Sequence, residues 1–278
     1  MIPLSEALES ITPKNRPSIE KHLKAVNIKT WKDMDRWHLT RFATEVKDSM
    51  AASSAHTTFA VLKAFLGKFE REIKLPEDWR KILHCRDEKS MPTYLTPNEV
   101  EAFGEAYVDS HKERTVRDGF YLSCKTGLRH SDLVKLLPSN FQPREGGGWL
   151  LTYVSKKTRI TSSVICSDAT KEKAEWLHKN GVPVPLDYYN DMVRTLAQRA
   201  DINTEVSVFE RGEEMSGPKW KFLKSHSARR TFCTICADLG VDVLDIMRMA
   251  GHTNPAMTAR YIVRHEVKVN PKVEQFLM

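Results

Sequence analysis

Cysteine is scarce in this sequence, which has five cysteines in 278 residues. An odd number cannot all pair within one chain, and their scatter argues against a disulfide-stabilised scaffold and for a reducing compartment. Only Cys233 and Cys236 are closely spaced, and no second cysteine pair stands at the spacing of a metal site. We therefore predict that these two cysteines pack inside a helix, and we expect no metal.

Long apolar runs are also absent. No window approaches 18 uninterrupted apolar residues, and the opening MIPLSEALESITPKNRPS lacks the charged-then-apolar order of a secretory signal. No internal repeat or low-complexity segment stands out. These absences predict a cytoplasmic globular protein without a membrane partner, and a hydrophobic content of 41% is enough for the core of one large or two smaller domains.

The charge balance is moderately positive, because 43 lysines and arginines outnumber 36 aspartates and glutamates and leave a net charge of +7 at pH 7. This balance is compatible with a phosphate-backbone partner such as nucleic acid but does not require one, since many basic proteins bind nothing acidic. Charge alone therefore leaves the function open.

Helical periodicity dominates the first part of the chain. Apolar residues recur at spacings of three and four in residues 19–26, 34–50 and 55–73, between short polar or serine-rich breaks. We predict a helical bundle over residues 1–84. Residues 85–95 are charged, contain a proline and show no helical period, so they are the predicted linker between two domains.

The second predicted domain begins with clear helix punctuation. Thr96, Pro97 and Glu99 read as a capping box with proline at the first helical position. Residues 149–154 and 160–165 are rich in β-branched and aromatic residues and flank the segment SKKTR, which predicts an antiparallel hairpin with a basic tip. Helices are expected again further on, so the predicted fold class is mainly α with a small antiparallel β-sheet.

Five short motifs contain residues that suit chemistry on a phosphate. His226 and Arg229 lie three apart at the expected N-terminal end of a helix, where backbone N–H groups favour an anion. The other motifs are TGLRHSD with Arg129, the hairpin tip with Lys156 and Lys157, AGHTN with His252, and TARYI with Tyr261. Each motif alone is short enough to arise by chance.

In residue type and in order along the chain, the five motifs together resemble the tyrosine recombinase (phage integrase) family. The resemblance implies that family's two-domain architecture: a helical core-binding domain over residues 1–84 and a mixed α/β catalytic domain over residues 96–278 with a tail at 262–278. Two packing positions depart from the pattern, because the smaller Ala228 and Ala250 stand where leucine is usual. These departures affect local packing more than chemistry.

The resemblance also implies the roles of a cleavage reaction. Arg129 and Arg229 would grip the scissile phosphate, and Tyr261 would attack phosphorus to leave a 3'-phosphotyrosyl link and a free 5'-hydroxyl. His226 would take part in proton transfer, because a phenol holds its proton at neutral pH, and His252 would hydrogen-bond a non-bridging oxygen. Neither ATP nor a metal nor any other cofactor is implied.

Two assignments stay open. The hairpin lysine that would protonate the departing 5'-oxygen matches the family's pattern better as Lys157 than as Lys156. Asp132, three residues after Arg129, would orient that arginine through a carboxylate contact, or else it is a solvated acid at a helix start.

The implied partner is double-stranded DNA at a specific recombination site. The protein would assemble as a tetramer on paired sites and be a monomer or weak oligomer when free, and its tail would dock on a neighbouring protomer or fold back on its own domain. Ser53, Ser54, His56 and Thr57 open a predicted helix whose end can meet DNA. The candidate basic contacts to DNA are Lys14, Arg16, Lys21, Lys24, Lys63, Lys68, Lys156, Arg159 and Arg230.

Two other functions fit the same residues. A type IB topoisomerase would use the same chemistry without strand exchange, and a non-catalytic DNA-binding regulator would keep the fold alone. The favoured prediction is a site-specific recombinase, because the ordered set of Arg, Lys, His, Arg, His and Tyr is intact.

Overall fold

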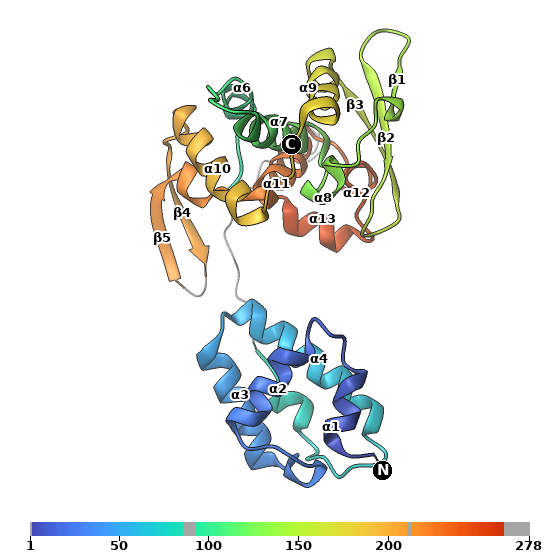
Figure 1. Cartoon of the computed structure of the whole chain (residues 1–278), viewed down its shortest axis with the longest axis vertical. Coiled ribbons are helices and arrows are strands. Elements are labelled where there is room, and N and C mark those ends of the chain that lie inside the picture. The colour runs from blue at the N-terminus through green and yellow to red at the C-terminus, as the bar shows by residue number, and fades with distance from the viewer. Residues whose placement is uncertain (1, 86–92, 211–212, 264–278) are drawn as a thin grey trace, which may run out of the picture. The chain divides into compact units, whose positions relative to one another are not determined.

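The computed structural model describes residues 2–85, 93–210 and 213–263, which divide into two compact units near residue 90 (Figure 1). The predicted linker lies mostly outside these ranges, and so does most of the predicted tail, so both remain predictions. None of the described helices combines the length and the apolar character that crossing a bilayer requires.

The first unit is a bundle of helices. Its elements are α1 (Leu4–Ala7), η1 (Leu8–Ser10), α2 (Arg16–Ala25), η2 (Trp31–Asp33), α3 (Arg36–Ser49), α4 (Ala52–Phe69) and α5 (Trp79–Ile82). Helices α2, α3 and α4 pack against one another and bury Leu39, Phe42, Phe59 and Leu62 among them. The helical bundle predicted for this part of the chain is confirmed.

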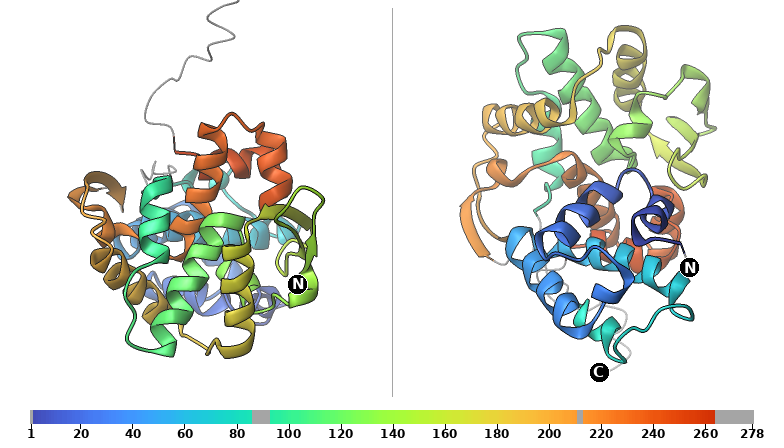
Figure 2. Two further views of the ribbon diagram at one scale, coloured as in Figure 1. Left: turned by 90° about the horizontal axis from the view of Figure 1, so that it is seen from above. Right: turned by 60° about the horizontal axis from the view of Figure 1, so that its bottom comes forward.

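The second unit is built around one central helix, α7. Its elements are α6 (Pro97–Gly104), α7 (His111–Thr126), α8 (His130–Leu133), η3 (Pro138–Asn140), β1 (Phe141–Pro143), β2 (Trp149–Val154), β3 (Thr161–Cys166), α9 (Asp168–Asn180), α10 (Leu186–Arg199), β4 (Glu205–Glu210), β5 (Glu213–Pro218), η4 (Lys219–Phe222), α11 (Ser225–Asp238), α12 (Val243–Ala250) and α13 (Pro255–Tyr261). Helix α7 contacts α6, α8, α9, α10 and α11. Seen from above in Figure 2, the green α7 lies between the teal α6 and the olive α9. The capping box of Thr96 and Glu99 is present at the start of α6, as predicted.

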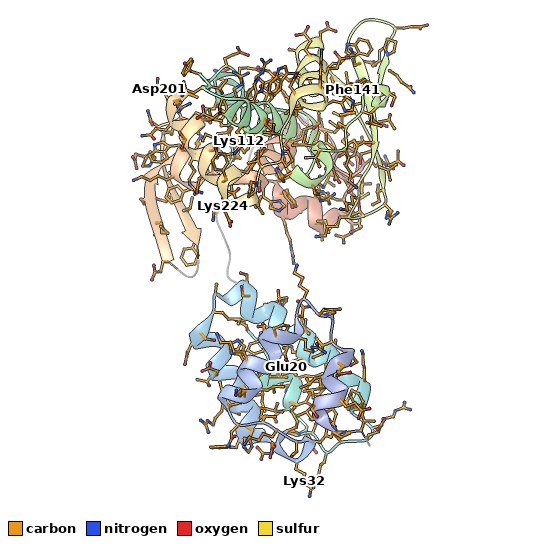
Figure 3. The ribbon with its side chains drawn as sticks, viewed as in Figure 1. Glu20, Lys32, Lys112, Phe141, Asp201 and Lys224 are labelled. Atoms are coloured by element: carbon orange, nitrogen blue, oxygen red, sulfur yellow. The ribbon has the colours of Figure 1, made fainter. Side chains whose placement is uncertain are left out.

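The predicted hairpin forms two strands, β2 and β3, of a three-stranded antiparallel sheet in which β2 is central. Strand β2 pairs with β3 in a register that places Leu151 opposite Val164, and both side chains are buried. The short strand β1 adds to the other edge of β2, and its Phe141, labelled in Figure 3, is buried in the same core. Strand β3 contacts α7 and α12, so the sheet packs against the two helices that come just before Arg129 and His252 in the chain.

A second sheet was not predicted. Strands β4 and β5 pair with each other in a stretch of the sequence for which no element was predicted. Strand β5 is polar apart from Met215, whereas β4 contains Val206, Val208 and Phe209, and the Ser207 and Ser216 hydroxyls hydrogen-bond to each other at 2.9 Å. The alternating valines of β4 are a local strand signal that was overlooked, and β5 has no such signal because its strand conformation depends on pairing with β4. The predicted fold class is otherwise confirmed.

Two glycines in left-handed conformation turn the chain just before predicted site residues. Gly127 ends α7 with φ of +70°, and Gly251 ends α12 with φ of +62°. A Cβ on Gly127 would lie 2.6 Å from the ring of Phe232, and one on Gly251 would lie 2.6 Å from the hydroxyl of Ser162. Neither position has room for a side chain.

Replacing Gly127 by alanine should therefore cost more stability than the same change at Gly240, which also has positive φ but has no atom within 4 Å of an added Cβ. Gly240→Ala should cost about 1 kcal/mol from backbone strain. Gly127→Ala should cost about 1–3 kcal/mol more, because the clash with Phe232 adds to the same strain. Urea unfolding of both variants measures the difference, and equal losses would contradict the proposed close approach.

Candidate active site

Arg229 is the buried charge at the centre of the site. It lies in the first turns of α11, which begins after Lys224 (labelled in Figure 3), and it is 1% exposed. Its Nη1 donates to the carbonyl oxygen of Gly127 at 2.5 Å, and its Nε donates to Nε2 of His252 at 3.1 Å. Its Nη2 is buried and has no hydrogen-bond partner among the described residues. A buried guanidinium with a free donor is a site that an anion can satisfy.

His252 supports this arginine from the turn between α12 and α13. The residue is 2% exposed, and burial, followed by the charges of Arg229 and Arg129, lowers its pKa to about 3. The ring is therefore neutral at neutral pH. Because Nε2 accepts from Arg229, Nδ1 carries the proton and donates to the hydroxyl of Thr258 at 3.0 Å. Both ring nitrogens are thus engaged, and a contact from His252 to a phosphate oxygen would require one of these bonds to be exchanged.

The ring of Tyr261, at the end of α13, is surrounded by basic side chains. It is stacked on His252 with ring centroids 4.9 Å apart and an interplanar angle of 27°, and it lies 6.5 Å from the ring of His226. The guanidinium carbons of Arg229 and Arg230 lie 5.6 and 5.8 Å from its centre. Two guanidinium groups therefore lie close enough to attract the π electrons of this ring.

His226 lies one turn before Arg229 on α11. Although the residue is exposed, neighbouring protein atoms remove water from its ring and lower its pKa, and the charges of Arg229, Arg129 and Arg230 lower that pKa further. At neutral pH the imidazole is therefore uncharged and able to accept a proton.

Arg129 is oriented by a buried polar network. Its Nη1 donates to the hydroxyl of Ser155 at 2.8 Å, and that hydroxyl donates to Oδ2 of Asp132 at 3.3 Å. The direct distance from Nη1 to Asp132 is 3.9 Å, so Ser155 bridges most of the contact. Asp132 is 4% exposed, and the alternative of a solvated helix-start acid is therefore wrong.

The tip of the β2–β3 hairpin brings basic residues to the same region. Lys156, Lys157 and Arg159 are exposed, and Arg159 has a positive φ of 59°. The charge of Lys157 contributes to lowering the pKa of His226. This contribution favours Lys157 as the lysine that faces the site.

The predicted DNA-contacting residues of the first unit do not form one cluster. Lys14, Ser53, Ser54 and Thr57 line a groove of about 570 Å³ at the N-terminal ends of α2 and α4. Arg16 pairs with Glu20 at 3.7 Å. The side chains of Lys21, Lys24, Lys63 and Lys68 do not line this groove. Arg230, by contrast, is part of the Tyr261 surroundings, and its Nη1 is buried without a partner among the described residues.

Several residues that the sequence analysis missed hold the site together. Ser155 joins Arg129 to Asp132, Thr258 holds His252, and Thr158 donates to the carbonyl oxygen of Gly251 at 3.2 Å. A lone serine or threonine carries no periodic or spacing signal. The one available signal was the position of Ser155 and Thr158 within the SKKTR tip.

Cys233 and Cys236 form no disulfide and pack in a helix as predicted. Cys233 is fully buried and Cys236 half-buried on α11, and burial raises their thiol pKa values to about 12 and about 11. Within the described ranges, no group of three or more metal-binding side chains comes together.

The model of the phage integrase family matches residues 93–266, which is more than half of the chain. The chain therefore belongs to the phage integrase (tyrosine recombinase) family, as the ordered motifs predicted.

Solved structures with a similar fold are bound to DNA. The integrase of transposon Tn1549 in complex with a circular intermediate DNA has a TM-score of 0.69 at 17% identity and covers 96% of this chain and 93% of its own. A lambda integrase dimer on a core site has a TM-score of 0.63 at 15% identity, with 97% and 98% covered. The XerH recombinase on a palindromic difH site has a TM-score of 0.61 at 14% identity, with 94% and 75% covered. No curated protein sequence matches the chain.

Because the buried His252 stays neutral in the folded protein, its titration should make folding sensitive to acid. Its pKa is about 3 in the folded state against an ordinary value of 6.5, so as pH falls below 6.5 the unfolded chain gains a proton that the folded chain does not. The resulting loss of unfolding free energy is about 1 kcal/mol per pH unit between these values.

His252→Gln removes this pH-dependent contribution to the free energy of unfolding while keeping a polar side chain. The stability difference between wild type and variant should therefore shrink as pH is lowered from 6.5 to 5, and urea unfolding at several pH values measures it. A difference that stays constant with pH would contradict the assignment.

Proposed function

We propose that the protein is a site-specific DNA recombinase that cuts and rejoins strands through a 3'-phosphotyrosyl intermediate. The observation that carries the proposal is the surroundings of Tyr261. The phenol ring is stacked on His252 and lies near Arg229 and Arg230, and one buried donor of Arg229 has no partner in the described part of the chain. Such an arrangement suits a tyrosine nucleophile beside a phosphate site.

The scissile phosphate would occupy the space that the two motif arginines face. The free Nη2 of Arg229 would donate to one non-bridging oxygen, and Arg129, held by Ser155, would donate to another. Fixed guanidinium groups would stabilise the extra negative charge that builds on phosphorus during attack. His252 would act mainly by holding Arg229 in this orientation.

Bond making and bond breaking balance with the chain's own groups. The phenolic oxygen of Tyr261 would form a bond to phosphorus while the bond from phosphorus to the 5'-oxygen breaks. The neutral His226 would accept the phenolic proton, and Lys157 would give a proton to the departing 5'-oxygen. The covalent link conserves the bond energy, so a 5'-hydroxyl from another strand can reverse the step and rejoin the DNA.

Strand exchange needs two cleaved duplexes to be held together, and a tetramer on paired sites is the assembly we propose for it. The related lambda integrase structure is a dimer on one core site, which supports one protomer for each half-site. The basic residues of the first unit, including Lys14 beside its groove, would add sequence-independent phosphate contacts.

A trapping experiment with the DNA that flanks the gene tests the proposal. A supercoiled plasmid carrying both flanking segments is incubated with the protein and quenched with detergent. Wild-type protein should leave a covalent protein–DNA adduct, and mass spectrometry should locate it on Tyr261. Tyr261→Phe should form no adduct, whereas Tyr188→Phe, a change of an exposed tyrosine on α10, should form it normally.

The other outcomes separate the alternatives. An adduct on Tyr261→Phe would remove this residue as the nucleophile. Relaxation of any supercoiled plasmid without a recombinant product would indicate a topoisomerase-like activity. Site-specific binding with no nicking by the wild-type protein would indicate a non-catalytic relative.

A further inference from the structure

The hairpin tip that carries Lys157 is closed by its own backbone. The amide of Ser155 donates to the carbonyl oxygen of Ile160 at 3.0 Å, and the amide of Arg159 donates to the carbonyl oxygen of Ser155 at 2.9 Å. Arg159 adopts a positive φ of 59° to complete the turn. The tip is therefore a compact turn whose position depends on what holds its two ends.

One end of the tip is fixed to the Arg129 region. The buried Ser155 hydroxyl accepts from Arg129 and donates to Asp132, and the backbone amide of Lys156 donates to Oδ1 of Asp132 at 3.1 Å. Asp132 thus serves two partners at once, one on each of two successive residues of the tip. This end moves only if the buried carboxylate moves.

The other end is fixed to the His252 region. The half-buried Thr158 donates its hydroxyl hydrogen to the carbonyl oxygen of Gly251 at 3.2 Å, across 93 residues of sequence. Gly251 is the left-handed residue that directs the chain into His252. Lys157 lies between the two anchors, and its own side chain is exposed and has no ion pair among the described residues.

We propose that Thr158 is a positioning residue for Lys157, because its hydrogen bond to Gly251 ties the lysine-bearing tip to the turn that carries His252. The inference rests on the proposed function, since it concerns the proton that Lys157 delivers to the 5'-oxygen. Together, the two anchors fix the backbone of Lys157 relative to Arg129 and Arg229. Without the Thr158 anchor, the side chains of the tip are tied to the site only through Asp132, and the lysine samples positions from which it cannot reach the leaving oxygen.

Two DNA substrates show whether Thr158 positions Lys157 as the general acid or has only a general structural role. The first is a synthetic duplex across the cleavage position mapped on the plasmid. The second is the same duplex with sulfur in place of the scissile 5'-bridging oxygen. A thiolate leaves without being protonated, so cleavage of the sulfur duplex does not need a general acid.

Thr158→Val removes the hydroxyl and keeps the shape of the side chain. It should slow adduct formation on the ordinary duplex by about tenfold or more, the cost of a misplaced catalytic group. It should cleave the sulfur duplex at the wild-type rate. Lys157→Ala should show the same pattern more strongly, and Thr158→Ser should recover most of the loss on the ordinary duplex.

Thr161→Val is the matched control on the same hairpin. Thr161 is exposed and its hydroxyl makes no hydrogen bond with the described residues, so this variant should match wild type on both duplexes. An equal loss on both duplexes for Thr158→Val would overturn the inference in favour of a general structural role, and no loss on either would overturn it outright. Failure of the proposed function is distinguished from both, because wild-type protein then forms no adduct with either duplex.

Discussion

The buried charge of Arg229 has to be satisfied inside the protein, and most of the site follows from how this is done. Its guanidinium donates to the carbonyl of Gly127 and to the ring of His252, which are 102 and 23 residues away along the chain. These two bonds join the end of α7, the start of α11 and the turn before α13. An unpaired buried charge is costly, so displacing any of the three elements is penalised. The donor that remains unpaired is the one available to an anion.

The same positive charge sets the protonation state of the surrounding groups. Burial and the two motif arginines keep His252 and His226 neutral, so one can accept a bond from Arg229 and the other can accept a proton. Tyr261 lies between these imidazoles and two guanidinium groups. The fold therefore brings positive charge, two neutral imidazoles and a phenol together, an arrangement that the proposed reaction would use as electrostatic preorganisation.

Much of the framework could be predicted from local sequence. The capping box at Thr96 and the hairpin were both found, because caps and β-branched runs act through short-range contacts. The β4–β5 pair was not, because the short valine alternation of β4 was overlooked and the polar β5 is a strand only through its pairing with β4. The sequence also did not show that, among the predicted DNA contacts, Lys14 lines a groove in the first unit whereas Arg230 lies beside Tyr261.

The sequence by itself determined the family, through the order of Arg129, Lys157, His226, Arg229, His252 and Tyr261. It also determined which helices form, since amphipathic spacing and caps are properties of neighbouring residues. Only the tertiary structure decided that His252 holds Arg229, that Ser155 shares Asp132 with Arg129 and that Thr158 anchors the lysine-bearing tip to Gly251. These contacts join residues that are far apart along the chain, and a single hydroxyl or imidazole gains its role from the partner that folding brings to it.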